Sequence, residues 1–165
     1  MCSPFEVLLF GLARTGSSDT LVSKGLGLEE RKTIQEEERS LMKPKILIID
    51  DGVDSWHLLS AALKAHDYYP VWAADGMQAI SAARLHQPQA ILLDLGLPGG
   101  DGFYVLERLK NNRMLSDIPV IVVTARDPQE AEEKARRLGA AAYVQKPVKI
   151  DGLVASLQTV LTTQV

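Results

Sequence analysis

The chain has 165 residues, which leaves room for one domain and a short appendage and excludes two full domains. Hydrophobic residues make up 46% and charged residues 24%, a composition typical of a globular chain rather than a disordered or fibrous one. Eighteen basic and twenty-one acidic residues give a net charge of -3. The overall positive field that nucleic-acid binding requires is missing, so we expect no direct nucleic-acid partner.

Cysteine content and hydropathy indicate the cellular compartment. Cys2 is the only cysteine, so an internal disulfide is excluded and a reducing cytoplasm is the expected location. The longest apolar stretch, residues 7–13, is far shorter than the roughly 20 residues that cross a bilayer. It also lacks the basic leader and cleavage site of a signal peptide. We therefore expect a soluble, unexported protein that makes no membrane contact.

The composition changes near residue 43, and residues 1–43 are predicted to be an N-terminal extension that is polar and partly helical or disordered. Leu28, Ile34 and Leu41 are spaced six and seven residues apart within its charged segment, so that segment could be helical. A stable coiled coil would need three or four sustained heptads. A second interpretation is that translation starts at Met42, which directly precedes an apolar strand.

From residue 44 onward, five short apolar runs alternate with segments of helical periodicity. Most of these runs lack polar alternation, as expected for parallel strands that are covered on both faces. The predicted strands are Ile46–Ile49, Val71–Ala74, Ala90–Leu93, Val120–Val123 and Ala141–Val144. Five strand–helix pairs with right-handed crossovers predict an α/β fold, a doubly wound five-stranded parallel sheet with five helices, because a barrel would need eight pairs.

Aspartates mark the expected start of every helix in this region. Asp75 and Asp127 are each followed three residues later by Gln or Glu, which is the pattern of a capping box. Pro128 occupies the first helical position after Asp127, where proline is favoured. The other expected N-caps are Asp54, Asp101 and Asp151.

Polar residues end the apolar runs, at the carboxyl ends of the strands where open α/β sheets place their sites. Asp50 and Asp51 follow the first strand and Asp94 the third, whereas Thr124 follows the fourth and Lys146 comes shortly after the fifth. Three carboxylates and one ammonium leave a formal charge of -2, which a divalent cation would neutralise. Oxygen donors without cysteine or histidine favour Mg²⁺.

The histidines and the nearby tryptophan have simpler interpretations. His57, His66 and His86 lie in or near predicted helices, so we expect neither a phosphotransfer histidine nor a zinc site. Trp56 lies just after the acid pair and is expected to be a packing residue.

The segment from Lys45 to about Leu161 resembles a response regulator receiver domain of bacterial two-component signalling. The matching motifs are "ILIIDD", "ILLDLGLPGGDG", "VIVVTA" and "AAYVQKP", which occur in this order and at the predicted strand ends. An ordered set of four motifs is far more specific than any one of them. The resemblance implies a receiver domain over residues 44–165, with the flavodoxin-like strand order 2-1-3-4-5.

The resemblance also implies a phosphoryl-acceptor site. Asp94 would receive a phosphoryl group from the phosphohistidine of a sensor histidine kinase or of a histidine phosphotransfer protein. Asp51 and Asp94 would bind Mg²⁺ directly, the backbone carbonyl of Gly96 would be a third protein ligand, and Asp50 would act through water.

Three further residues would respond to the phosphoryl group. The resemblance implies that Thr124 and Lys146 bind its oxygens and that Tyr143 is the aromatic that moves with the threonine. The peptide bond between Lys146 and Pro147 is expected to be cis, which only X-Pro bonds adopt cheaply. The signal would pass through the face formed by the fourth helix, fifth strand and fifth helix of the receiver to a downstream protein target.

The sequence departs from the usual family pattern in the loops beside these acids. Gly52 stands where a polar or acidic residue is more frequent, and Gly96 offers no side chain to shield a phosphoryl group. Arg126, two residues after Thr124, occupies a position thought to tune hydrolysis of the acyl phosphate.

Two classes of function remain open at this stage. The first is a phosphorylation-controlled switch that is not an enzyme beyond its own phosphoryl transfer and slow autodephosphorylation. The second is a phosphorylation-independent adaptor or dimerisation module with the receiver fold. A phosphatase is poorly supported, because Gly96 stands where a second aspartate would act as the general acid. We expect a monomer or weak homodimer, and a stand-alone receiver because few residues follow the last predicted helix.

Overall fold

The computed structural model describes residues 27–98 and 102–163. Its internal contacts divide the chain into two compact units, residues 1–39 and residues 40–165. This division lies a few residues before the boundary predicted at residue 43. The expected N-cap Asp101 lies outside the described residues.

Helix α1 (Leu28–Leu41) begins in the N-terminal unit and ends two residues past its boundary at Arg39. Good helix formers such as Glu, Gln, Lys and Arg fill this segment. Leu28 and Ile34 are exposed, at 79% and 40%. The described residues contain six helices, which are the five predicted after residue 44 and α1, because the charged segment of the extension forms a full helix.

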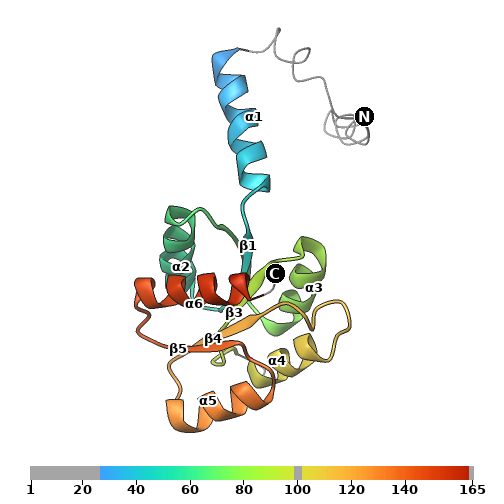
Figure 1. The fold of residues 1–165 in the computed structure, drawn as a ribbon, viewed down its shortest axis with the longest axis vertical. Helices are drawn as coiled ribbons and strands as arrows, with labels where there is room; N and C mark the ends of the chain where they lie inside the picture. The colour runs from blue at the N-terminus through green and yellow to red at the C-terminus, as the bar shows by residue number, and fades with distance from the viewer. Residues whose placement is uncertain (1–26, 99–101, 164–165) are drawn as a thin grey trace. The chain divides into compact units, whose positions relative to one another are not determined.

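The second unit is built on a parallel sheet with the strand order β2-β1-β3-β4-β5 (Figure 1). The strands are β1 (Lys45–Ile49), β2 (Tyr69–Ala73), β3 (Ala90–Leu93), β4 (Val120–Thr124) and β5 (Ala142–Gln145). The predicted doubly wound parallel sheet and its order are confirmed. Every residue of β3 and β4 is buried, in agreement with apolar runs that lack polar alternation.

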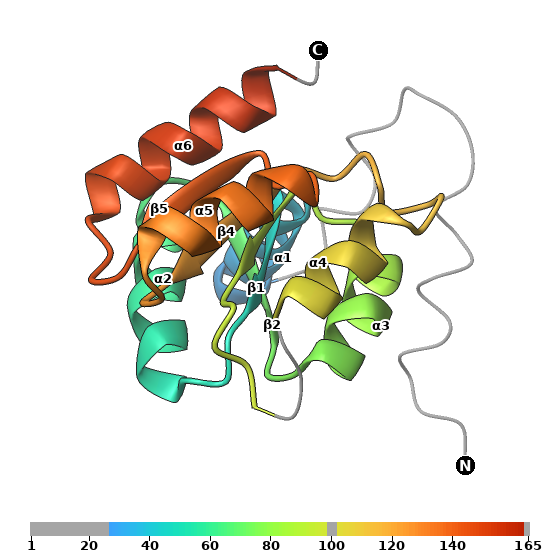
Figure 2. The same ribbon diagram turned by 90° about the horizontal axis from the view of Figure 1, so that it is seen from below.

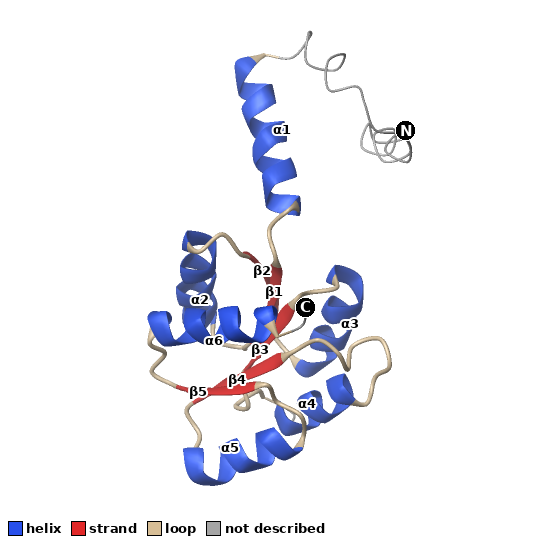
Figure 3. Cartoon of the chain, viewed as in Figure 1, coloured by secondary structure: helices blue, strands red, loops and turns tan. Residues whose placement is uncertain are grey.

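Helices cover both faces of the sheet, as Figures 2 and 3 show. They are α2 (Val53–Ala65), α3 (Gly76–His86), α4 (Gly102–Lys110), α5 (Pro128–Arg137) and α6 (Ile150–Thr162). Buried residues of α3, α4 and α5 form one hydrophobic cluster with the sheet, and those of α2 and α6 form the other. No helix in the described ranges has the length and apolar character needed to cross a membrane.

The helix starts confirm some predicted caps and correct others. Asp75 accepts a hydrogen bond from the backbone N–H of Gln78, and Asp127 accepts one from Gln129 rather than from Glu130. The predictions for Asp54 and Asp151 are wrong. The caps of these two helices are Gly52 and Lys149, neither of which makes a side-chain cap bond, and both aspartates lie within the first helical turn. There their charge still favours the positive end of the helix dipole.

The strand register brings the functional residues to one edge of the sheet. Ile49 of β1 lies beside Leu93 of β3, and the backbone N–H of Asp94 donates to the carbonyl of Ile49 at 2.9 Å. The N–H of Lys146 donates to the carbonyl of Thr124, also at 2.9 Å. The loops that follow four neighbouring strand ends therefore meet in one place.

Candidate functional site

One ammonium group connects two of the three predicted acids. Lys146 Nζ lies 2.8 Å from Asp50 Oδ2 and 2.6 Å from Asp94 Oδ2. Ser55 Oγ lies 3.4 Å from the same nitrogen. The side chains of Asp50, Asp94 and Lys146 are exposed by only 4%, 12% and 21%, so the cluster is largely shielded from water and its charges interact strongly.

The two acids are held by the same kind of turn. Asp50 Oδ1 accepts the backbone N–H of Gly52 at 2.8 Å, and Asp94 Oδ1 accepts the N–H of Gly96 at 2.8 Å. A side-chain oxygen that accepts the N–H two residues later makes an Asx turn. Each carboxylate thus presents one oxygen to its own loop and the other to Lys146.

These contacts decide the charge state of Lys146. Burial by itself lowers the pKa of Lys146. The hydrogen bonds to Asp50 and Asp94 and the negative charges of both carboxylates raise it by more than burial lowers it, so the pKa lies above its usual value. Lys146 therefore stays a cation throughout the physiological pH range. The bond between Lys146 and Pro147 is cis, as predicted.

Asp51, the third predicted acid, is not gathered with the other two. It is exposed, and Gly96 is exposed as well. Within residues 27–98 and 102–163, no three side chains of His, Cys, Asp or Glu are close enough together to form a metal centre. The assembled part of the site is therefore two carboxylates and one lysine, and Asp51, the next residue after Asp50, is exposed to solvent.

Thr124 and Tyr143 are linked through the backbone of Arg126. Thr124 is 1% exposed, and its hydroxyl oxygen accepts the N–H of Arg126 at 3.3 Å. Tyr143 in β5 donates its hydroxyl proton to the carbonyl of Arg126 at 3.2 Å. Burial, followed by the charges of Glu132 and Asp127, raises the pKa of Tyr143, so its hydroxyl stays protonated.

The side chain of Arg126 reaches back to the loop that follows Asp94. Its Nη2 donates to the carbonyl of Leu95 at 3.0 Å, and its guanidinium lies 5.6 Å from the ring centroid of Phe103. Sequence reasoning identified Arg126 only as a position that could tune hydrolysis. Its contact with Leu95 joins residues 31 positions apart, which no local pattern indicates.

Trp72 is a second residue near the site that the sequence did not single out. Its indole Nε1 donates to the backbone carbonyl of Asp50 at 2.8 Å. Trp56, expected to be a packing residue, stacks on Trp72 with ring centroids 5.5 Å apart and an interplanar angle of 10°.

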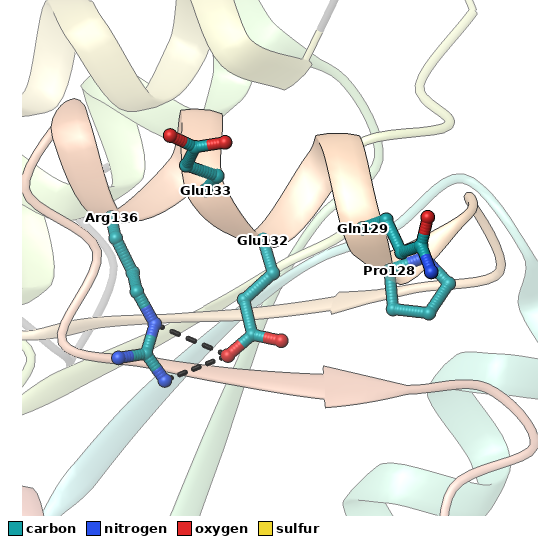
Figure 4. A pocket seen from close by; sticks show the side chains of 5 residues that line it. All are labelled: Pro128, Gln129, Glu132, Glu133 and Arg136. Atoms are coloured by element: carbon teal, nitrogen blue, oxygen red, sulfur yellow. Dashed lines mark hydrogen bonds and ion pairs between the residues drawn. The ribbon is translucent and has the colours of Figure 1, made fainter.

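A surface hollow of about 330 Å³ lies apart from these acids along α5 (Figure 4). The lining residues are Pro128, Gln129, Glu132, Glu133 and Arg136. Arg136 pairs with Glu132 one helical turn away at 2.7 Å, and both side chains extend from the same side of α5. The hollow contains none of the predicted site residues and belongs to the face expected to carry the output.

The fold is a doubly wound α/β domain with two aspartates and a lysine at the carboxyl edge of its parallel sheet. Comparisons with known proteins show which family of such domains the chain belongs to. The family model for the response regulator receiver domain matches residues 46–158. The chain therefore belongs to the response regulator receiver family.

Individual relatives and solved structures agree with this assignment. Protein PilH of Pseudomonas aeruginosa is 33% identical over 71% of this chain and 97% of its own length. The transcriptional regulatory protein KdpE of Staphylococcus aureus is 39% identical over 72% of this chain and half of its own length. A putative response regulator from Chloroflexus aurantiacus has a TM-score of 0.69 at 28% identity, covering 73% of this chain and 99% of that one.

Proposed function

We propose that this protein is a phosphorylation-controlled signalling switch in which Asp94 accepts a phosphoryl group. The observation that carries the proposal is the single ammonium of Lys146 between Asp50 and Asp94. Family membership supports the same conclusion, since receiver domains take part in two-component signalling with histidine kinases and downstream targets. The 12% exposure of the Asp94 side chain leaves it accessible to a phosphoryl donor.

The chemistry requires positioning and charge neutralisation more than acid–base catalysis. A carboxylate oxygen of Asp94 attacks the phosphorus of a phosphohistidine, so an O–P bond forms while the N–P bond to the imidazole breaks. The N–H of Gly96 orients the Asp94 carboxylate, and Lys146 supplies a cation for the negative charge on the transferred group. The hydroxyl of Thr124, at the adjacent strand end, becomes a hydrogen-bond donor to the phosphoryl oxygens.

The donors in this region fit Mg²⁺. Asp50 and Asp94 provide carboxylate oxygens in a shielded position, and the exposed Asp51 and Gly96 supply further oxygens from the solvent side. Mg²⁺ keeps several waters and needs few protein ligands, so a close cluster of three acids is not required. Bound there, it would offset the negative charge that gathers during transfer. We propose Asp51, Asp94 and the Gly96 carbonyl as direct ligands, with Asp50 acting through water.

We propose that the signal leaves through α5, β5 and α6. The contacts of Thr124 and Tyr143 with the backbone of Arg126 connect the acid site to β5 and to the loop before α5. A change at Thr124 would therefore bias this face, where a partner protein binds. We further propose that the protein works in the cytoplasm as a monomer or weak homodimer. Its phosphoryl donor would be a histidine kinase or histidine phosphotransfer protein, and it would not act as an enzyme on other substrates.

Phosphoryl transfer is tested with a small donor. Acetyl phosphate and Mg²⁺ should add one phosphoryl group to the full chain, seen by intact mass, and Asp94→Asn should abolish the addition. The matched control is Asp54→Asn, which removes an exposed carboxylate from α2 and should leave the addition unchanged. A wild-type chain that stays unmodified at saturating donor would reject the switch and favour the adaptor function.

The metal assignment is tested by thermal unfolding. At ten times its Kd, Mg²⁺ should raise the Tm of the wild type by on the order of 4 °C, because a ligand that binds only the folded state stabilises it by mass action. Asp51→Ala should lose most of this rise. If Asp51→Ala showed the same rise as the wild type, Asp51 would not be a ligand.

A further inference from the structure

The two stacked tryptophans differ in their contacts: Trp56 packs against the hydrophobic cluster of α2 and α6, whereas Trp72 contacts the acid site. Trp72 is on β2, the edge strand of the sheet, and is 38% exposed. Its indole N–H donates to the backbone carbonyl of Asp50 at 2.8 Å, and its ring lies nearly parallel to that of Trp56 at a centroid separation of 5.5 Å. Because Trp72 is partly exposed and donates a short hydrogen bond to the acid segment, packing against Trp56 alone does not account for its position.

The bond forms where the backbone ladder between β1 and β2 ends. Ile49 is paired with Ala73, the last residue of β2, and the N–H of Asp50 donates to the carbonyl of Ala73 at 3.2 Å. Beyond this point the chain turns into α3, whose N-cap is Asp75. The indole N–H therefore extends the hydrogen bonding of β1 by one residue past the end of its partner strand.

That carbonyl belongs to the peptide group that joins Asp50 to Asp51. A hydrogen bond to its oxygen sets the plane of the peptide, and this plane sets the direction in which the Asp51 backbone leaves the strand. On the other side of the turn, Asp50 Oδ1 holds the N–H of Gly52 at 2.8 Å. The segment that carries both acids is thus restrained from two directions.

We propose that Trp72 is a positioning residue for the acid pair, orienting the Asp50–Asp51 peptide for Mg²⁺, and that Trp56 keeps the indole in place by stacking. The inference rests on the proposed function, because it takes these acids as metal ligands. Trp72 does not touch the metal and acts only through the peptide.

Two matched variants separate the hydrogen bond from the packing. Trp72→Phe keeps an aromatic ring against Trp56 and removes the N–H donor. Trp56→Phe leaves the donor in place and changes only the stacked ring. Measured on the full chain by titration calorimetry, Trp72→Phe should bind Mg²⁺ about three- to tenfold more weakly than the wild type, the effect of one lost hydrogen bond. Trp56→Phe should weaken binding by less than about twofold.

NMR spectroscopy of the wild type provides a second test that does not depend on whether a variant folds. The indole N–H resonance of Trp72 should shift on addition of Mg²⁺ and exchange slowly with solvent, whereas that of Trp56 should shift less. A pair that only packs would respond equally. Equal Mg²⁺ affinity of Trp72→Phe and wild type would overturn the inference and leave the proposed function intact. A wild type that does not bind Mg²⁺ would overturn both.

Discussion

The turns after β1 and β3 have the same construction and differ in exposure. In each turn, one carboxylate oxygen of an aspartate accepts a hydrogen bond from the N–H of the glycine two residues later at 2.8 Å. The other carboxylate oxygen accepts one from Lys146 Nζ. The side chain of Asp50 is 4% exposed, whereas that of Asp94 is 12% exposed. In the proposed function, the more buried Asp50 would fix charge and the more exposed Asp94 would react.

The two turns also differ in what holds their backbones. The carbonyl of Asp50 accepts from Trp72, whereas the carbonyl of Leu95 accepts from Arg126 at 3.0 Å and from the N–H of Gly102 at 3.3 Å. The second turn is thus tied to α4 and to the loop that follows Thr124. Movement at Thr124 can reach the Asp94 turn through Arg126. Both turns are also linked to Thr124 through Lys146, whose backbone N–H donates to the Thr124 carbonyl and whose Nζ contacts both aspartates.

The largest expected effect on stability concerns Gly102, which lies against the backbone of the Asp94 turn. A Cβ on Gly102 would lie 2.5 Å from Leu95 Cα and 2.6 Å from the carbonyl oxygen of Asp94, and both are backbone atoms. Gly102→Ala should therefore cost about 3 kcal/mol in the free energy of unfolding, measured by urea denaturation. Gly152→Ala, where a Cβ meets nothing within 4 Å, is the control and should be neutral or stabilising. Equal stability of the two variants would contradict the close approach.

A second, smaller effect should follow from removing the cation that both turns share. Lys146→Met leaves the buried Asp50 carboxylate without its partner, and the free energy of unfolding at pH 7 should fall by about 2 kcal/mol. The folded-state pKa of Lys146 is raised, so its contribution is complete below the usual pKa of 10.5 and is lost as the pH rises through the folded-state value.

Urea unfolding of wild type and Lys146→Met across this pH range would check the sign. The stability difference between the two should stay constant from pH 7 to about 10 and shrink at higher pH. A difference that grew with pH would contradict the raised pKa.

The smallest effect compares the two glycines directly. A Cβ on Gly52 would lie 3.0 Å from Asp50 Oδ1, whereas one on Gly96 would lie 3.4 Å from Asp94 Oδ1. Both carboxylates are bound to Lys146, so the shorter contact decides the difference: Gly52→Ala should cost about 1 kcal/mol and Gly96→Ala less than about 0.5 kcal/mol. Thermal unfolding of the pair measures this, and a reversed order would mean that the Asp94 turn is the more tightly packed one.

Much of the fold follows from local sequence patterns. The strands β1, β3 and β4 read as uninterrupted apolar runs because a central parallel strand is buried on both faces. The run predicted at residues 71–74 corresponds to the edge strand β2, Tyr69–Ala73, where Tyr69 and Trp72 are exposed. The acids at the strand ends were predictable for the same reason, since parallel strands bring their carboxyl ends to one edge.

Local patterns did not give the first residue of two helices or the extent of α1. Asp54 and Asp151 have the residue type of an N-cap, but the helices begin before them, at Val53 and Ile150. The charged segment of α1 has helix-forming residues without a clear apolar face, so periodicity alone did not distinguish a full helix from a partly ordered one.

The sequence by itself determined the order of strands and helices, the edge where polar residues gather and the identity of the acids, because these depend on hydrophobic patterns and on the geometry of parallel sheets. The tertiary structure decided which groups meet. Lys146 contacts Asp50 and Asp94, which are 96 and 52 positions away, and Trp72 contacts a carbonyl 22 positions away. Such contacts depend on strand register and side-chain packing, which no local pattern encodes, and they separate a buried aspartate from an accessible one.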